Sequence, residues 1–117
     1  MNTSNKDINR IDRCFAELKA ANKKALITFV TAGDPDLETT EKTVLEMFDR
    51  GADIIELGVP FSDPIAEGVT IQKASLRSLN NDTTLDKIFD TVKNIRTKTD
   101  KPLLPVSYTH LTLPTIA

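Results

Sequence analysis

Hydrophobic residues recur at helical spacing near the start of the chain and then give way to an uncharged run. The helical stripe consists of Ile8, Ile11, Phe15 and Leu18. Its period predicts one amphipathic helix. Residues 25–32 carry no charge and are rich in β-branched and aromatic types. That composition is typical of a strand buried on both faces, as in a parallel sheet.

A second helix and a second strand are predicted to follow the uncharged run. Asp34 is suited to the N-cap of this helix and Pro35 to its first turn. The apolar side of the helix is formed by Val44, Leu45, Met47 and Phe48. Gly51 stands where a helix favours a glycine after its last turn, and residues 54–59 predict a strand. This order predicts one βαβ unit with parallel strands and a right-handed crossover.

The rest of the chain repeats the alternation of helices and strands. Residues 69–79 form a short segment with apolar spacing. Thr83 and Asp86 form a loose capping box, which predicts the start of another helix. The apolar positions of that helix are Leu85, Ile88, Phe89, Val92 and Ile95. Residues 101–104 predict the start of a third strand, so the fold class is α/β.

Composition narrows the class of protein and its partners. The 117 residues include 15 Lys and Arg against 17 Asp and Glu, a net charge of −2, which disfavours nucleic acid as a partner. Neither a secretory signal nor a membrane-spanning run is visible, and the one cysteine, Cys14, excludes an internal disulfide; we therefore expect a cytoplasmic protein without a membrane partner. The sequence also lacks the common motifs for nucleotide cofactors and metals.

Glu56 is the most informative position for chemistry, because it lies in the middle of the second predicted strand among hydrophobic residues. A buried carboxylate must be paired, protonated or open to solvent. Side chains alternate along a strand, so Glu56 shares a face with Gly58, which leaves space beside it. Near the carboxyl end of such a strand, where α/β proteins bind ligands, Glu56 could act as acid and base. The alternative is a structural ion pair with a core arginine or lysine.

Three further residues carry weaker signals. Glu67 lies in the loop that leaves the same strand end, so two carboxylates could face one pocket, although a loop glutamate is usually a solvated surface residue. Asp63 stands between a serine and a proline, which also suits a turn. Phe29 is predicted to line the interior with Thr31, although packing in the core explains it equally well.

Two motifs carry a resemblance to a known family. Residues 29–35 read FVTAGDP and residues 51–64 read GADIIELGVPFSDP, with the extension IAEGVTIQ over residues 65–72. This pattern closely resembles the tryptophan synthase alpha chain family, and the resemblance covers roughly residues 8–104. It implies a (β/α)₈ TIM barrel, of which this chain would hold about the first three strands with an N-terminal helix.

The resemblance also implies an activity and a partner. The family cleaves indole-3-glycerol phosphate to indole and glyceraldehyde 3-phosphate, a lyase reaction in tryptophan biosynthesis. Its catalytic carboxylates fall on Glu56 and Glu67, and a substrate-lining position falls on Phe29. No cofactor is implied for this chain, since pyridoxal phosphate belongs to the beta chain, with which the family forms a heterotetramer of two alpha and two beta chains. The subunit contact falls near Pro60, Asp63 and Pro64, which belong to one loop.

The sequence departs from the family pattern at two places. The family most often has Asp-Gly-Pro where this chain has Glu67, Gly68 and Val69, so the second carboxylate is one methylene longer. Residues 105–117 match nothing in the pattern. We therefore expect the first part of a barrel domain over residues 1–104 and a foreign tail over residues 105–117. Because later strands and the phosphate-gripping loops of the family are missing, we expect these 117 residues to be inactive by themselves.

Two other functions remain open at this stage. One is a short, non-catalytic protein that binds a beta-type chain through residues 60–64. The other is a different barrel enzyme that acts on a sugar or phosphate substrate with Glu56 as base. The motif around Glu56 argues against the second of these, because it is highly specific.

Overall fold

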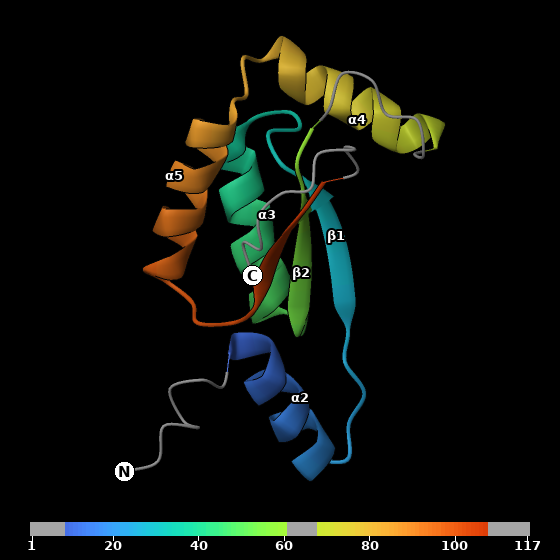
Figure 1. Ribbon diagram of the computed structural model, residues 1–117, viewed down its shortest axis with the longest axis vertical. Helices are drawn as coiled ribbons and strands as arrows, with labels where there is room; N and C mark the ends of the chain where they lie inside the picture. The colour runs from blue at the N-terminus through green and yellow to red at the C-terminus, as the bar shows by residue number, and fades with distance from the viewer. Residues whose placement is uncertain (1–8, 61–67, 108–117) are drawn as a thin grey trace.

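A computed structural model describes residues 9–60 and 68–107 of the chain, and within them the fold is α/β (Figure 1). Three parallel strands form one sheet in the order β1-β2-β3. The strands are β1 (Ile27–Thr31), β2 (Ile54–Gly58) and β3 (Leu103–Val106). The helices are α2 (Arg10–Ala20), α3 (Leu37–Asp49), α4 (Val69–Asn80) and α5 (Leu85–Arg96). The sheet order follows the chain order, as the predicted βαβ unit requires.

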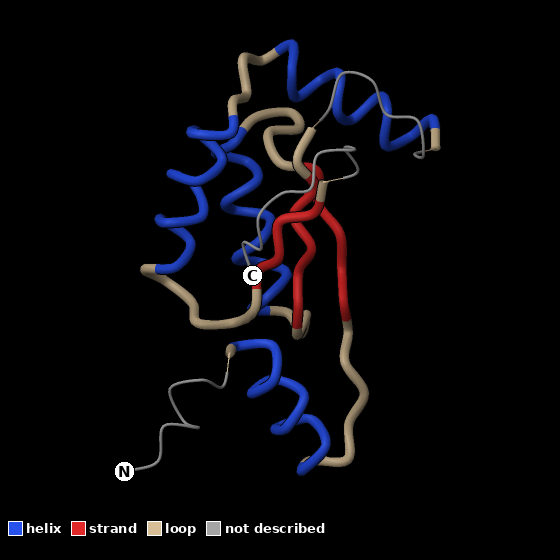
Figure 2. The backbone as a smooth tube through the Cα atoms, in the orientation of Figure 1, coloured by secondary structure: helices blue, strands red, loops and turns tan. Residues whose placement is uncertain are grey.

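The hydrophobic core lies between the sheet and the pair α3 and α5, which pack side by side against one face of it (Figure 2). β2 contributes Ile55 and Leu57, both fully buried. The helices contribute Val44 and Phe48 from α3 and Ile88 and Ile95 from α5. These are the positions that the helical period predicted, because burying one apolar stripe per helix is what stabilises such a layer.

The strand register decides which side chains share the other face of the sheet. Phe29 of β1 is the partner of Glu56 in β2, and Glu56 is the partner of Leu104 in β3. Since Ile55 and Leu57 point to the helices, the alternation of side chains puts this row of three on the opposite face. Glu56 therefore lies on the face of the sheet that points away from α3 and α5.

The predicted start of α3 is wrong by two residues. Asp36, not Asp34, is the N-cap, and its carboxylate accepts a hydrogen bond of 2.7 Å from the backbone N–H of Thr39. Asp34 is joined to Pro35 by a cis peptide bond and lies outside the helix. Its carboxylate instead accepts two hydrogen bonds from Arg77 of α4, a contact that local sequence does not reveal.

A similar correction applies to α5, whose N-cap is Thr84 rather than Thr83. The hydroxyl of Thr84 accepts a hydrogen bond of 3.3 Å from the backbone N–H of Lys87. Thr83 is buried and packs close to Gly33. Both threonines can cap a helix, and the tertiary contact decides between them.

The strand boundaries also differ slightly from the predicted ones. β1 covers residues 27–31 of the predicted 25–32, and β2 ends at Gly58. β3 continues to Val106, two residues beyond position 104, and Pro105 and Val106 pair in register with β2. These two residues are thus part of the sheet; the assignment of the remaining tail stays a prediction.

α2 lies at the amino-terminal ends of the strands (Figure 1). The predicted helix is confirmed over Arg10–Ala20, but none of its residues is buried, and Phe15 is 46% exposed. The ion pair of Arg10 with Asp100, 2.8 Å between Nε and Oδ1, ties the start of the helix to the segment before β3. The apolar stripe of α2 therefore lies mostly outside the core that α3 and α5 share.

Candidate active site

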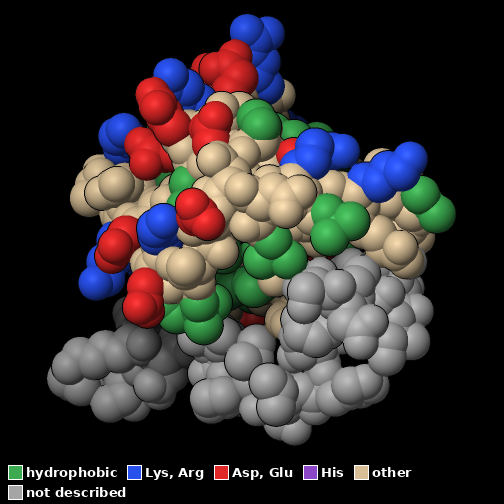
Figure 3. Space-filling model, turned by 90° about the horizontal axis from the view of Figure 1, so that it is seen from above, with side chains coloured by type: hydrophobic (Ala, Val, Ile, Leu, Met, Phe, Trp, Pro, Cys, Tyr) green, Lys and Arg blue, Asp and Glu red, His purple; other side chains and the backbone are tan. Residues whose placement is uncertain are grey.

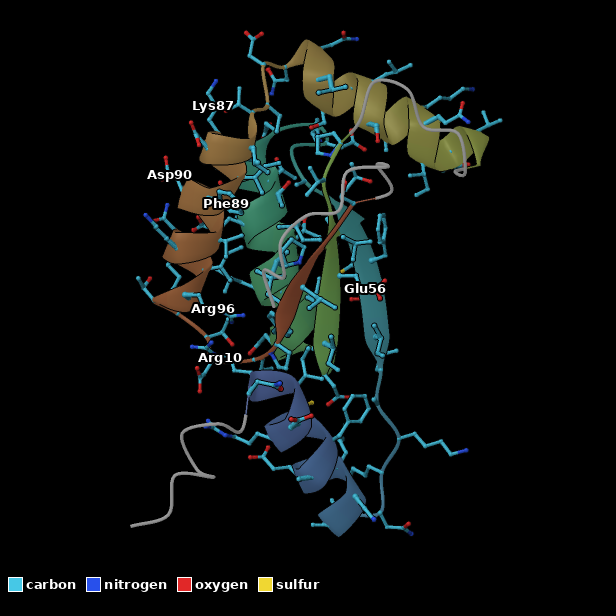
Figure 4. All side chains as sticks on the ribbon, in the orientation of Figure 1. Arg10, Glu56, Lys87, Phe89, Asp90 and Arg96 are labelled. Carbon is cyan, nitrogen blue, oxygen red and sulfur yellow. The ribbon has the colours of Figure 1, made fainter. Side chains whose placement is uncertain are left out.

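The candidate site is the face of the sheet that α3 and α5 leave open. Figure 4 shows Glu56 on the sheet, well apart from the labelled Phe89 and Asp90 of α5. Glu56 is only partly buried, although its neighbours Ile55 and Leu57 are fully buried. β2 thus presents one carboxylate to a different environment from the core, as the alternation of its side chains requires.

Within the described ranges, the carboxylate of Glu56 takes part in no ion pair and no side-chain hydrogen bond. The alternative interpretation, in which a core arginine or lysine neutralises Glu56, therefore finds no support in this part of the chain. A partly shielded carboxylate without a cation partner can both accept and deliver a proton, which is the chemistry expected of a general acid and base.

Phe29 lies beside Glu56 and covers Gly58. The two residues Phe29 and Glu56 are register partners, and both are partly buried. A Cβ atom on Gly58 would collide with Cζ of the Phe29 ring and would lie 3.0 Å from Cε2. Glycine is thus required for the ring to lie where it does, and the aromatic face beside the carboxylate depends on this close approach.

The carboxyl ends of the strands are bordered by α4 and by the loop between β1 and α3. Ser78 of α4 donates a hydrogen bond of 2.6 Å to the carbonyl of Ala32, and Asn81 donates one of 2.9 Å to the carbonyl of Pro35. Gly33, with φ +83°, fits between Ser78 and Thr83 where a Cβ atom would clash with both hydroxyls. The loop and α4 are therefore closely interlocked at this end of the sheet.

The side chains of Asp34 and Arg77 add an ion pair to this contact. Nε of Arg77 lies 2.8 Å from Oδ1 of Asp34, and Nη2 lies 2.9 Å from Oδ2. The hydrogen bond to Asp34 raises the pKa of the Arg77 guanidinium. Sequence reasoning did not predict a role for Arg77, Ser78 or Asn81, since only the tertiary fold brings them to the loop after β1.

The other predicted site residues divide into two groups. Pro60 lies just beyond the end of β2 and is partly buried. The residue before it, Val59, donates a backbone hydrogen bond of 2.8 Å to the carbonyl of Val106. Asp63, Pro64 and Glu67 lie outside the described residues. Their predicted roles therefore stay predictions.

The end of the molecule that carries α4 has both charged and apolar surface (Figure 3). Acidic and basic side chains are intermixed over much of this face, and hydrophobic side chains lie along the border with the residues drawn in grey. On α4 itself, Val69 is 64% and Leu76 50% exposed. This mixture gives no uniformly basic surface on the face that the figure shows, in line with the near-neutral charge of the chain.

An open hollow of about 470 Å³ lies at the opposite end, between α2 and the segment before β3. Several of its charged groups have partners: Arg10 and Arg13 both bind Asp100, and the carboxylate of Asp53 accepts a hydrogen bond from the N–H of Leu26. Burial lowers the pKa of Arg96 at this end, and the positive charge of the nearby Arg10 lowers it further. The ion pairs in this hollow join α2 to the segment before β3. The candidate site therefore remains the face of the sheet around Glu56.

Metal and membrane interpretations gain nothing from the described part of the chain. Residues 9–60 and 68–107 contain no group of three or more histidine, cysteine, aspartate or glutamate side chains that could hold a metal ion. Over the same ranges, every helix is too short or too polar to cross a lipid bilayer.

Comparison with known proteins assigns the family. A family model described as the tryptophan synthase alpha chain matches residues 15–115. The chain belongs to the tryptophan synthase alpha chain family. The alpha chain of Geotalea daltonii is 56% identical over 101 residues, and that of Geotalea uraniireducens is 57% identical over the same length. Each alignment covers 86% of this chain and 38% of the relative, so the chain spans less than two fifths of the curated relatives that it matches.

Solved alpha chains have the same fold over the matching part. The tryptophan synthase alpha subunit of Legionella pneumophila is 40% identical, with a TM-score of 0.84 over 86% of this chain and 39% of that structure. A tryptophan synthase complex from Pyrococcus furiosus is 43% identical, with a TM-score of 0.69 over 74% of this chain and 35% of that structure. The α/β sheet of this chain is therefore the first part of the family's TIM barrel.

Proposed function

We propose that the alpha chain represented by these residues cleaves indole-3-glycerol phosphate to indole and glyceraldehyde 3-phosphate, a lyase reaction in tryptophan biosynthesis. The observation that carries the proposal is Glu56. Its carboxylate stands on the open face of the sheet, beside Phe29, and has no cation partner among the described residues. A family member with a carboxylate in this setting has the acid and base that the reaction needs.

The chemistry explains why a proton-transferring group is wanted there. A proton delivered to indole C3 places positive charge at the ring nitrogen. As a proton then leaves the hydroxyl of the glycerol chain, the carbon that bears it becomes the aldehyde, the bond from that carbon to C3 breaks, and the electron pair of the bond neutralises the ring as indole. Glu56 is proposed to carry out these proton transfers, because one carboxyl group can deliver the first proton and accept the second.

Glu67 and Phe29 are proposed to assist at the indole ring. Glu67 would accept a hydrogen bond from the ring N–H and stabilise the cation as it forms, an interaction that is stronger in the transition state than in the ground state. The ring of Phe29, held over Gly58, would offer an apolar surface to the indole. The proposal requires no cofactor or metal in this chain.

The partner in this proposal is a tryptophan synthase beta chain that carries pyridoxal phosphate. A structure of the Pyrococcus furiosus protein is described as an α2β2 complex with mutual activation of its subunits. We propose that residues Pro60, Asp63 and Pro64 lie at the corresponding contact here, because they leave the strand that bears Glu56. We further propose that the 117 residues alone do not turn over substrate, since among the described residues β1 and β3 each pair with β2 only and the sheet does not close into a barrel.

A hybrid enzyme tests the assignment of Glu56. Residues 9–106 of this chain replace the matching segment of the Geotalea daltonii alpha chain, and this full-length hybrid is assayed for release of indole from indole-3-glycerol phosphate. Glu56→Gln keeps the size of the side chain and removes its ability to transfer protons. We expect at least about a 100-fold loss of kcat, the scale of a general acid–base contribution.

Glu46→Gln is the matched control, because Glu46 lies on the outer side of α3, where its side chain is 60% exposed and pairs with Arg50. It should leave indole release unchanged. Circular dichroism and beta-chain binding of the Glu56→Gln hybrid would show that its fold is retained. Indole release by a folded Glu56→Gln hybrid at the unsubstituted rate would overturn the role of Glu56.

A further inference from the structure

Gly58 lies at a position where the backbone itself does not require a glycine. It is the last residue of β2, and its φ lies outside the positive range that Gly33 and Gly51 adopt. Glycine is unfavourable in a strand, because it loses more backbone freedom on folding than other residues and has no side chain to pack. The reason for a glycine here therefore lies in its surroundings.

The neighbour that requires a glycine at position 58 is the ring of Phe29. The three atoms nearest to the place of a Cβ atom on Gly58 are Cζ, Cε2 and Cε1 of that ring, so the far half of the ring fills the space of the missing side chain. In the register of the two strands, however, Phe29 pairs with Glu56 and not with Gly58. The ring therefore extends past Glu56 toward the carboxyl end of β2.

The contact between Phe29 and Gly58 lies outside the hydrophobic core of the described residues. Phe29 belongs neither to the core cluster nor to the partly buried hydrophobic residues packed against it, whereas the next residue, Val30, belongs to the latter. Because side chains alternate along a strand, Phe29 and Gly58 both lie on the face that α3 and α5 leave open. β2 thus contains an unfavourable glycine that makes room for a ring beside Glu56 rather than for a core side chain.

We propose that Gly58 is a positioning residue, which lets the ring of Phe29 lie close to the sheet and thereby sets the size of the aromatic ring that fits beside Glu56. Any side chain at position 58 would lift the far half of the Phe29 ring away from the sheet, into the space that an aromatic ligand on this ring would occupy. The carboxyl group of Glu56 would stay in place. The identity of the ligand as an indole ring rests on the proposed function, whereas the steric coupling of Phe29 to Gly58 does not.

The first experiment measures binding of indole, which requires no turnover. Equilibrium dialysis gives the affinity for indole of the full-length hybrid, of its Gly58→Ala and Phe29→Leu variants, and of the double variant. We expect Gly58→Ala to weaken binding about tenfold, the scale of one added methyl group in a closely packed pocket. In the Phe29→Leu background the same substitution should weaken binding much less, because leucine lacks the far half of the ring. Phe15→Leu is the matched control, since Phe15 lies on α2 and is 46% exposed.

The second experiment measures the consequence for the reaction. Gly58→Ala should raise KM for indole-3-glycerol phosphate about tenfold and change kcat much less, because Glu56 is retained. Phe29→Leu should change the choice of substrate. When a methyl group is placed in turn on each hydrogen-bearing carbon of the six-membered indole ring, at least one methylated substrate should gain about tenfold in kcat/KM relative to the unsubstituted one. A merely structural role of Gly58 would lower the thermal unfolding midpoint and leave KM unchanged.

The outcomes separate the two proposals. Unchanged indole binding in a folded Gly58→Ala hybrid, or equal weakening with and without the ring of Phe29, would overturn the positioning role, as would a parent hybrid that does not bind indole. Unchanged selectivity of Phe29→Leu among the methylated substrates would overturn the role in ring size. A parent hybrid that shows the expected coupling in indole binding, but never cleaves indole-3-glycerol phosphate, would refute the proposed function and leave the role of Gly58 supported.

Discussion

The two sets of helices around this sheet are held by different forces. α3 and α5 bury Val44, Phe48, Ile88 and Ile95 against β2 and one another. α4, at the carboxyl ends of the strands, is held by Ser78, Arg77 and Asn81 through hydrogen bonds to a single loop. Apolar packing does not depend on the direction of individual contacts, whereas hydrogen bonds depend on the position of individual atoms.

This difference separates stability from the placement of functional groups. Apolar burial scales with area and supplies most of the free energy of folding. Directed hydrogen bonds contribute less, but they fix the orientation of the groups that they join. The layer of α3 and α5 thus covers one face of β2, and α4 borders the carboxyl ends of the strands.

The largest effect is expected from the apolar layer. Leu57→Ala would remove a fully buried side chain from the contact between β2 and the helices. We expect a loss of about 2–5 kcal/mol in the free energy of unfolding of the hybrid, measured by urea denaturation. Leu76→Ala on α4, where the side chain is 50% exposed, should cost less than about 0.5 kcal/mol. Equal costs at the two positions would show that the two sets of helices are held alike.

An intermediate effect is expected where α4 meets the loop. Ser78→Ala would leave the buried carbonyl of Ala32 without its 2.6 Å hydrogen bond. We expect a loss of about 1–3 kcal/mol, the cost of an unsatisfied buried polar group. Ser75→Ala is the control in the same helix, because Ser75 is equally buried but has no side-chain hydrogen bond among the described residues. If both variants lose the same stability, the hydrogen bond does not hold α4.

The smallest effect is expected at Asp36, which caps α3 beside the loop that α4 binds. The hydrogen bond from the N–H of Thr39 holds the pKa of Asp36 below its usual value of 3.8. An ionised group with a lowered pKa stabilises the fold fully above its unfolded value, and this contribution is lost as pH falls through the folded one. Thermal unfolding midpoints should therefore decline less steeply below pH 3.8 in Asp36→Asn than in the parent hybrid.

The asparagine introduced by Asp36→Asn would still cap the helix, so the two midpoints should agree near neutral pH. Asp49→Asn, at the other end of α3, removes a carboxylate without a capping role and is the control. Parallel pH profiles for Asp36→Asn and the parent hybrid would contradict the contribution of the ionised cap.

Local sequence was enough to define the elements and to identify the central carboxylate. Uncharged runs and helical spacing predicted three strands and the apolar faces of α3 and α5, because burying those faces requires that pattern whatever surrounds it. The alternation of side chains along residues 54–59 predicted that Glu56 shares a face with Gly58. The motif around Glu56 predicted the family, which the comparison with known alpha chains confirmed.

The choice among several suitable residues for each polar role depended on the tertiary fold. Asp34 and Asp36 are both able to cap α3, as Thr83 and Thr84 are able to cap α5, and local sequence does not choose between them. Contacts with α4 and Gly33 occupy Asp34 and Thr83, and a nearby residue becomes the cap in each case. Hydrogen bonds act over one short distance in one direction, so their partners are known only when the fold has brought distant parts of the chain together.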